Sequence, residues 1–317
     1  MRSEKSWPAA SCESERLAAE RLVERLNSLL DGEGVVSALV ACGTPAIEPL
    51  RAFLLKGTPN VVYQPRRWAV DALAGLAAKD VLIEYLQQSR EIPDPAIRLA
   101  EEAVENAAAR HLAAWKSEDV FRALLKAAAR RSRAGVIEGL GKFQRAEALP
   151  CFIKALEDDC CRAPAEEALR QLGSEALPVL IETCRTQEPS ELPSSLRRRA
   201  SAAEILSESN LPTGAWPLLR SLLDERDPSI LVPVSRLAVR YGTHEDQACA
   251  LRRLIEALPA SDGFLCLRIE DILADLYPAH QRTLDAEFAR RSALPDGRRV
   301  SDQVLRTLMR VRRRKGA

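Results

Sequence analysis

Residues 147–178 read EALPCFIKALEDDCCRAPAEEALRQLGSEALP, and this stretch indicates the fold of the chain. It begins and ends with the same tetrapeptide, Glu-Ala-Leu-Pro. Proline is tolerated in the first turn of an α-helix, because the N–H group that it lacks would have no partner within the helix there. Both copies therefore predict helix starts, one at each end of the segment.

The same mark occurs elsewhere, with an apolar residue beside proline in Ile47-Glu48-Pro49-Leu50 and Ala215-Trp216-Pro217-Leu218. A marked helix is followed by a second helix that ends in a small residue and an apolar pair, as in Ala72, Leu73 and Leu76. The closing positions recur roughly every 31 to 36 residues, the period of stacked helical pairs. They are Leu76, Ala107, Leu140, Leu172, Leu206, Tyr241 and Leu276.

This pattern predicts an all-α protein, an α-solenoid of roughly seven helical hairpins over residues 34–277. Aromatic residues make up only 4% of the chain, and no stretch alternates at period two as strands do. Residues 1–33 would form a tail and a capping helix from about Ser14 to Leu30. Residues 278–317 would form a C-terminal cap and a basic helix. The apolar face of the capping helix consists of Leu22, Leu26, Leu29 and Leu30.

The net charge of +1 hides an uneven distribution. Residues 281–317 carry eleven Arg or Lys against four Asp or Glu, so the other 280 residues are net acidic by six charges. No apolar run approaches the roughly 18 residues needed to span a bilayer, and the amino terminus has no signal-peptide core. We therefore expect a soluble cytoplasmic protein without membrane insertion. Its eight cysteines lack a C-x-x-C pair and are expected to be free thiols.

A second pattern concerns the turns within the hairpins. Asp94-Pro95-Ala96-Ile97-Arg98-Leu99-Ala100 combines a turn with a helix start, and Asp227-Pro228-Ser229-Ile230 repeats it, with Leu231 in the place of the arginine. Over roughly residues 34–277 the chain resembles the HEAT-repeat family. The resemblance implies a right-handed superhelix whose second helices line a concave surface, in proteins that mostly bind other proteins. It extends to the HEAT-like repeats of phycobilin lyase subunits, although nothing in the sequence specifies chromophore attachment.

Residues suited to catalysis or metal binding are sparse. His111, His244 and His280 lie far apart in the sequence, and only His244 has a cysteine close by, Cys249. Two such ligands do not complete a four-ligand zinc site, so we expect no metal and no cofactor. The motifs of serine hydrolases, zinc proteases and phosphate-binding loops do not occur. A non-enzymatic role is favoured, although a pocket assembled across repeats would leave no sequence motif.

Arginine recurs on the predicted second helices. One interpretation is a basic stripe on the concave wall, as in the HEAT-like DNA glycosylases, for which Trp68, Asp71 and Trp115 are the positions to nominate. The other is ion pairing with acids such as Glu101, Glu102, Glu105, Glu166 and Glu167. We favour ion pairing, because this region is net acidic and nucleic-acid surfaces are basic. The arginines are Arg66, Arg67, Arg98, Arg131, Arg133, Arg162, Arg197, Arg198, Arg199, Arg236, Arg240 and Arg268.

The predicted contact surface for a partner lies among these arginines. Arg197, Arg198 and Arg199 follow the proline-containing connection 186–195 and open a second helix, at the expected edge of the concave face. Three adjacent residues cover too much of a helix circumference to point all inward, so at least one should face solvent. The other residues predicted to bind the partner are Arg66, Arg67, Arg131, Arg236 and Arg240.

The basic end of the chain has two interpretations. Its charges suit an acidic partner, RNA or an anionic surface. Alternatively, Val300, Val304, Leu305, Leu308 and Val311 form an apolar face that docks on the last repeat. The charged residues of this segment are Arg298, Arg299, Arg312, Arg313, Arg314 and Lys315.

The sequence therefore favours a non-enzymatic scaffold or binding module that contacts another protein through the concave face. A nucleic-acid-binding or DNA-repair protein that uses the arginine stripe and the basic tail is the alternative. An enzyme subunit of the lyase type comes third.

Overall fold

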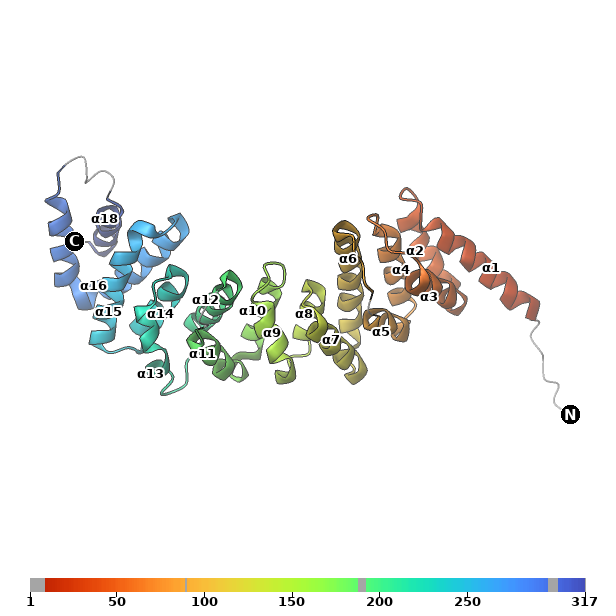
Figure 1. The fold of residues 1–317 in the computed structure, drawn as a ribbon, viewed down its shortest axis with the longest axis horizontal. Coiled ribbons are helices and arrows are strands. Elements are labelled where there is room, and N and C mark those ends of the chain that lie inside the picture. The colour runs from red at the N-terminus through yellow and green to blue at the C-terminus, as the bar shows by residue number, and fades with distance from the viewer. Residues whose placement is uncertain (1–8, 89, 188–191, 296–301, 317) are drawn as a thin grey trace. The chain divides into compact units, whose positions relative to one another are not determined.

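A computed structural model of the chain describes residues 9–88, 90–187, 192–295 and 302–316. These residues form seventeen α-helices joined by turns and short 3₁₀ segments, and they include no strand (Figure 1). The predicted all-α class is confirmed. The chain consists of two compact units, Met1–Gln171 (unit 1) and Leu172–Ala317 (unit 2). The predicted boundaries at residues 33 and 277, and the solenoid arrangement, stay predictions.

In unit 1 the helices pair and alternate between two layers. One layer contains α2 (Gly32–Cys42), α4 (Gln64–Gly75), α6 (Pro95–Leu112) and α8 (Ala134–Gly141). The other contains α3 (Ile47–Lys56), α5 (Lys79–Gln87), α7 (Glu118–Arg130) and α9 (Leu149–Ala155). α1 (Ala9–Arg25) packs on α2 and α3, and α10 (Arg162–Leu172) ends at the boundary of the unit.

Unit 2 has the same alternation. One layer contains α11 (Leu177–Arg185), α13 (Trp216–Leu219), the 3₁₀ helix η5 (Arg220–Asp224) and α15 (His244–Ala257). The other contains α12 (Pro193–Glu208), α14 (Pro228–Tyr241) and α16 (Gly263–Ser292), and α18 (Gln303–Lys315) packs on α16.

The turn and proline signals place the helix starts as predicted. Pro150, Pro178 and Pro217 lie in the first two positions of α9, α11 and α13. The carboxylate of Asp94 accepts hydrogen bonds from the N–H groups of Ala96 and Ile97, at 2.8 and 3.1 Å, and that of Asp227 caps α14. Such caps satisfy amide groups that have no partner within the helix.

The recurrent apolar signature forms the core of both units. In each of the seven repeats at least one of its residues is completely or almost completely shielded from solvent. The buried members include Leu73, Val104, Leu140, Leu169, Leu206, Ala238 and Leu273.

The first helix begins and ends about five residues earlier than predicted. α1 ends at Arg25 rather than near Leu30, and Leu29 and Leu30 are 58% and 97% exposed instead of facing the core. The side chain of Asn27 donates to the carbonyl oxygen of Glu24, and the hydroxyl of Ser28 donates to Asp31. Short polar side chains that bond locally favour a turn over a helix, which accounts for the early end.

The basic helix is docked rather than extended. Val304, Leu305, Leu308 and Val311 of α18 are all buried, and three of them belong to the same apolar cluster as α16. Val300 lies outside the described residues. α16 bends at His280, two residues after Pro278. Proline lacks the N–H group that would continue the helical hydrogen bonding, which accounts for a bend near this position.

Candidate functional site

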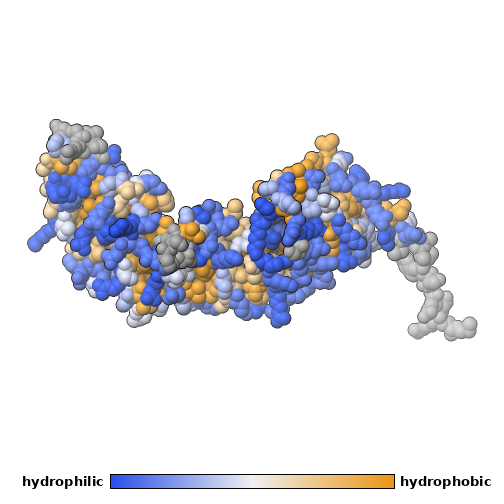
Figure 2. All heavy atoms as spheres, in the orientation of Figure 1, coloured by the Kyte–Doolittle hydropathy of each residue, from blue (hydrophilic) through white to orange (hydrophobic). Residues whose placement is uncertain are grey.

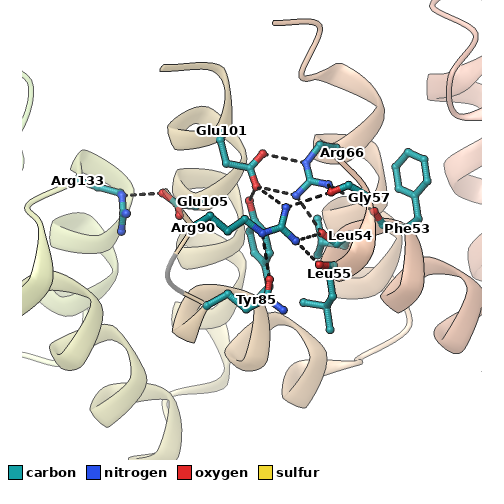
Figure 3. Close-up of polar contacts among 11 residues, drawn as sticks. Phe53, Leu54, Leu55, Gly57, Arg66, Tyr85, Arg90, Glu101, Glu105 and Arg133 are labelled. Carbon is teal, nitrogen blue, oxygen red and sulfur yellow. Dashed lines mark hydrogen bonds and ion pairs between the residues drawn. The ribbon is translucent and has the colours of Figure 1, made fainter. Parts of the chain in front are cut away.

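The predicted arginine row begins with a buried network in unit 1 (Figure 3). Arg66 on α4 is only 4% exposed and donates to Glu101 on α6 through Nε at 2.8 Å and Nη2 at 2.6 Å. Nη2 also donates to the carbonyl oxygen of Leu54, at 2.9 Å. The hydroxyl of Tyr85 donates to the same carboxylate at 2.8 Å, and burial together with Glu101 raises the pKa of Tyr85 well above its usual value. This arginine is therefore unavailable to a partner.

Several other arginines bond to the last carbonyl groups of an earlier helix. Arg90 donates to the carbonyl oxygens of Leu54 at 3.0 Å and Gly57 at 3.2 Å, at the end of α3. Arg240 does the same to Ser207 at the end of α12, at 2.9 Å. Arg253 on α15 donates to carbonyl groups at the end of η5. Because the last carbonyls of a helix lack internal partners and carry partial negative charge, these contacts join consecutive hairpins.

The acids predicted as ion-pair partners do pair with arginines. Arg131 contacts Glu102, and Arg133 lies 2.6 Å from the carboxylate of Glu105. Together with the pair of Arg66, three of the five nominated acids, all on α6, pair with arginines of neighbouring hairpins. Arg131 and Arg133 lie in the turn before α8 and not on the second helix, where the sequence placed them. Glu166 pairs with Arg170 on its own helix at 3.6 Å. The ion-pair interpretation of the arginine row is confirmed for these residues.

Two residues predicted to contact a partner are buried instead. Arg66 is one, and Arg199 is the other: it is 1% exposed, donates from Nε to the carbonyl oxygen of Cys184 at 3.0 Å and pairs with Glu225. Arg197 and Arg198 are half-buried. Their partner-binding role stays a prediction, whereas for Arg66 and Arg199 it is wrong, because the protein itself surrounds both guanidinium groups.

The remaining predicted contact residues are more accessible. Arg131 and Arg240 are exposed but bonded within the unit, as described above. Arg67 is exposed and Arg236 is half-buried, and neither forms an ion pair with a residue that the structure describes.

In unit 2 the second helices also approach each other directly. Arg268 on α16 donates to both carboxylate oxygens of Glu204 on α12, at 2.8 and 2.5 Å, so the pair bridges the intervening helix α14. The guanidinium group also lies over the ring of Phe264, 5.8 Å from its centre. Arg268 is one of the arginines of the predicted basic stripe, and here it forms an ion pair within unit 2.

The basic tail is partly neutralised by the helix on which it docks. Arg312 lies 3.2 Å from Asp285, and Arg314 lies 2.7 Å from Asp271. Arg313 and Lys315 are exposed, and Arg298 and Arg299 lie outside the described residues.

The positions nominated by analogy with DNA glycosylases have local partners. Asp71 lies 2.7 Å from Nε2 of His111, which sequence analysis did not connect with it. Trp68 packs against Gly32 so closely that a Cβ atom added there would lie 2.2 Å from its ring. Trp115 is half-buried in the short 3₁₀ helix that follows α6.

Two histidines that are distant in the sequence meet in unit 2. The rings of His244, at the start of α15, and His280, at the bend of α16, stack with centres 4.3 Å apart. Nε2 of His280 is buried and has no hydrogen-bond partner among the residues that the structure describes. Within the described ranges no three His, Cys, Asp or Glu side chains converge as metal ligands would.

Sequence analysis did not find the open groove of about 1360 Å³ in unit 2. It lies among η5, α15 and the part of α16 that follows the bend. Its apolar lining comes from Leu223, Ala248, Cys249, Leu251, Ile255 and Ala286. Its charged lining comes from Arg220, Asp224, Glu245, Asp246, Arg252, Glu256, Arg282, Glu287, Arg290 and Arg291.

One wall of the groove is fixed by a buried carboxylate. Asp246, 5% exposed, accepts hydrogen bonds from Nε1 of Trp216 at 2.9 Å and from the backbone N–H of Thr243 at 3.0 Å, and it pairs with Arg220 at 3.2 Å. Burial acts to raise the pKa of Asp246, but these hydrogen bonds outweigh it, so the pKa is lowered. The start of α15 is thus tied to α13 and η5.

On the face seen in Figure 2, hydrophilic residues predominate and hydrophobic atoms lie between them in small groups. No helix in the described part of the chain combines the length and the apolar character needed to cross a membrane.

Neither protein-family models nor curated protein sequences match the chain. The resemblance to HEAT repeats therefore stays a prediction based on the residues quoted above.

Proposed function

We propose that the chain is a HEAT-like helical binding module that contacts another protein through the groove of unit 2. The observation that carries this proposal is the groove itself, which combines an apolar lining with charged rims, as protein-binding surfaces do. The groove faces solvent, and its walls are held by internal contacts such as those of Asp246.

This proposal moves the contact surface away from the arginine row. Arg66, Arg131, Arg133, Arg199 and Arg268 contribute to internal ion pairs. A nucleic-acid surface needs a concentrated set of accessible cations, because it neutralises several phosphates at once. The pairing of these arginines favours a protein partner over nucleic acid.

Site-specific photocross-linking tests the proposal. A photoreactive amino acid at Ala248, which lines the groove, should cross-link a partner in extracts of the source cells. The identified partner is then purified and titrated against the full chain. Ala286→Trp, which fills the groove, should abolish binding, whereas Ala289→Trp on the same helix should not. Both alanines are exposed, but only Ala286 lines the groove.

Binding that persists unchanged in Ala286→Trp would reject the groove as the contact surface. Salt-sensitive binding of RNA or DNA, lost when Arg313 and Lys315 are changed to glutamate, would favour the nucleic-acid alternative instead.

A further inference from the structure

Each of the two long walls of the groove is formed by one face of a helix, α15 on one side and α16 on the other. α15 contributes Glu245, Ala248, Arg252 and Ile255, and α16 contributes Arg282, Ala286 and Arg290. Spacings of three and four residues place the members of each set on one side of their helix. The groove therefore lies between two helical surfaces, with small side chains at Ala248 and Ala286.

The dimensions of the groove suit one further helix. A helix with its side chains is about 10–12 Å wide, and the groove is open to solvent along its length, so the length of its walls sets the length of helix that it can contact. The lining of α15 from Glu245 to Glu256 corresponds to a rise of about 16 Å, and that of α16 from Arg282 to Arg291 to about 14 Å. Both wall lengths correspond to about three helical turns.

The charges of the groove leave two cations uncompensated. Arg252 and Arg282 are exposed, and neither forms an ion pair with a described residue. The other three arginines are paired: Arg220 with Asp246, Arg290 with Glu287, and Arg291 with Glu287 and Asp302.

Most of the carboxylates already have a stabilising contact. Besides Asp246 and Glu287, Glu256 pairs with Arg253 outside the groove at 3.0 Å. Glu245 lies in the first turn of α15, where the helix amide groups favour negative charge. This leaves Arg252 and Arg282 as the groove cations without an ion-pair partner among the described residues, although the lining as a whole is neutral, with five arginines and five carboxylates.

We infer that the groove binds an acidic amphipathic helix of about three turns, a step that rests on the proposed protein-binding function. Apolar side chains of this helix would lie against Ala248, Ile255 and Ala286. Its carboxylates would pair with Arg252 and Arg282. Helix-in-groove binding of this kind uses residues at spacings of three and four for both sets of contacts.

Two designed peptides test the inference on the full chain. Each has about 16 residues, since shorter helices are marginal in water, with a leucine stripe and flanking glutamates in one and lysines in the other. Fluorescence polarisation should show binding of the glutamate peptide only. Arg252→Glu with Arg282→Glu should weaken it about tenfold or more, because two attractions become repulsions. Arg226→Glu, an exposed arginine outside the groove, is the matched control.

The outcomes separate this inference from the proposed function. Equal or tighter binding of the lysine peptide, or no binding of either peptide, would overturn the inference. So would binding of the glutamate peptide that Ala286→Trp leaves unchanged. If Ala286→Trp blocks the purified cross-linked partner but the double charge reversal does not, the groove is a protein-binding site for a different kind of segment. If Ala286→Trp does not block that partner, the proposed function itself fails.

Discussion

Arg66 and Glu101 lie 35 residues apart in the sequence, yet they share two hydrogen bonds of 2.8 and 2.6 Å, and each residue is 4% exposed. The same guanidinium group donates to the carbonyl oxygen of Leu54, so the pair links α3, α4 and α6. A buried ion pair contributes little over a well-packed apolar pair, but loss of one partner leaves a charge without compensation.

Arg66→Ala should therefore lower the free energy of unfolding of unit 1 by about 3–5 kcal/mol. Arg51→Ala is the comparison, because its pair with Glu84 is 40% and 44% exposed and should contribute about 0–1 kcal/mol. Urea unfolding followed by circular dichroism measures both. Equal losses for the two variants would show that burial does not set the contribution of this pair.

Among Arg197, Arg198 and Arg199, we expect Arg199 to contribute most to the free energy of unfolding of unit 2. Arg199→Ala removes contacts with Cys184 and Glu225 from a site that is 1% exposed, so it should destabilise unit 2 by about 3 kcal/mol or more. Arg197→Ala should have a smaller effect, because that side chain is half-buried. Thermal unfolding of the two single variants decides the matter. Changing all three arginines to glutamate should unfold the unit, because it places a carboxylate at the buried position of Arg199. That variant therefore cannot report on partner binding.

The sequence predicted the helix starts but not which of the three adjacent arginines, Arg197 to Arg199, is buried. The helix starts at Asp94 and Asp227 followed from local chemistry, since a carboxylate and a proline act within one turn. Three adjacent arginines, in contrast, differ only by rotation about the helix. Their burial depends on the angle at which α12 packs against α11 and α14, which no local pattern encodes.

The groove of unit 2 could not be predicted either, because it depends on how three separate elements, η5, α15 and α16, pack together. Its walls come from residues between Arg220 and Arg291, and the part of α16 that lines it follows the bend at His280. Sequence analysis did not predict this bend, although Pro278 lies two residues before it. By contrast, the ion pairs of Glu101, Glu102 and Glu105 were predictable, because acids and arginines recur in register with the repeats.

The cysteines should differ in their reactivity. Burial raises the pKa of Cys184 to about 12, so almost no thiolate is present at pH 8, and the side chain is not exposed. Cys160 is exposed in the turn before α10. Titration with a disulfide reagent at pH 8 should modify Cys160 within minutes and Cys184 only after unfolding, with mass spectrometry identifying the sites. Comparable rates in the native protein would contradict the burial of Cys184.

Stability should fall in mild acid because of His280. Burial and neighbouring His244 lower the pKa of His280 below 6.5 in the folded state. The unfolded chain then binds the proton more readily, so this contribution to stability is present above about pH 6.5 and is lost as the pH falls through the folded pKa. His280→Phe should reduce the difference in melting temperature between pH 7 and pH 5. His111→Gln serves as the control, and an unchanged pH dependence in His280→Phe would rule out this histidine as the cause.

The docking of α18 gives the last prediction, since Leu308 and Met309 are neighbours with opposite surroundings. Leu308 is 1% exposed and belongs to the core cluster with α16, whereas Met309 is 40% exposed. Truncation of a buried leucine removes apolar contacts and leaves a cavity, so Leu308→Ala should cost about 2–5 kcal/mol. Met309→Ala should cost less than about 1 kcal/mol, because most surface substitutions have small effects. Urea unfolding of unit 2 measures the difference. If Leu308→Ala is as mild as Met309→Ala, the basic helix is not docked in solution, and its arginines become available to an acidic partner.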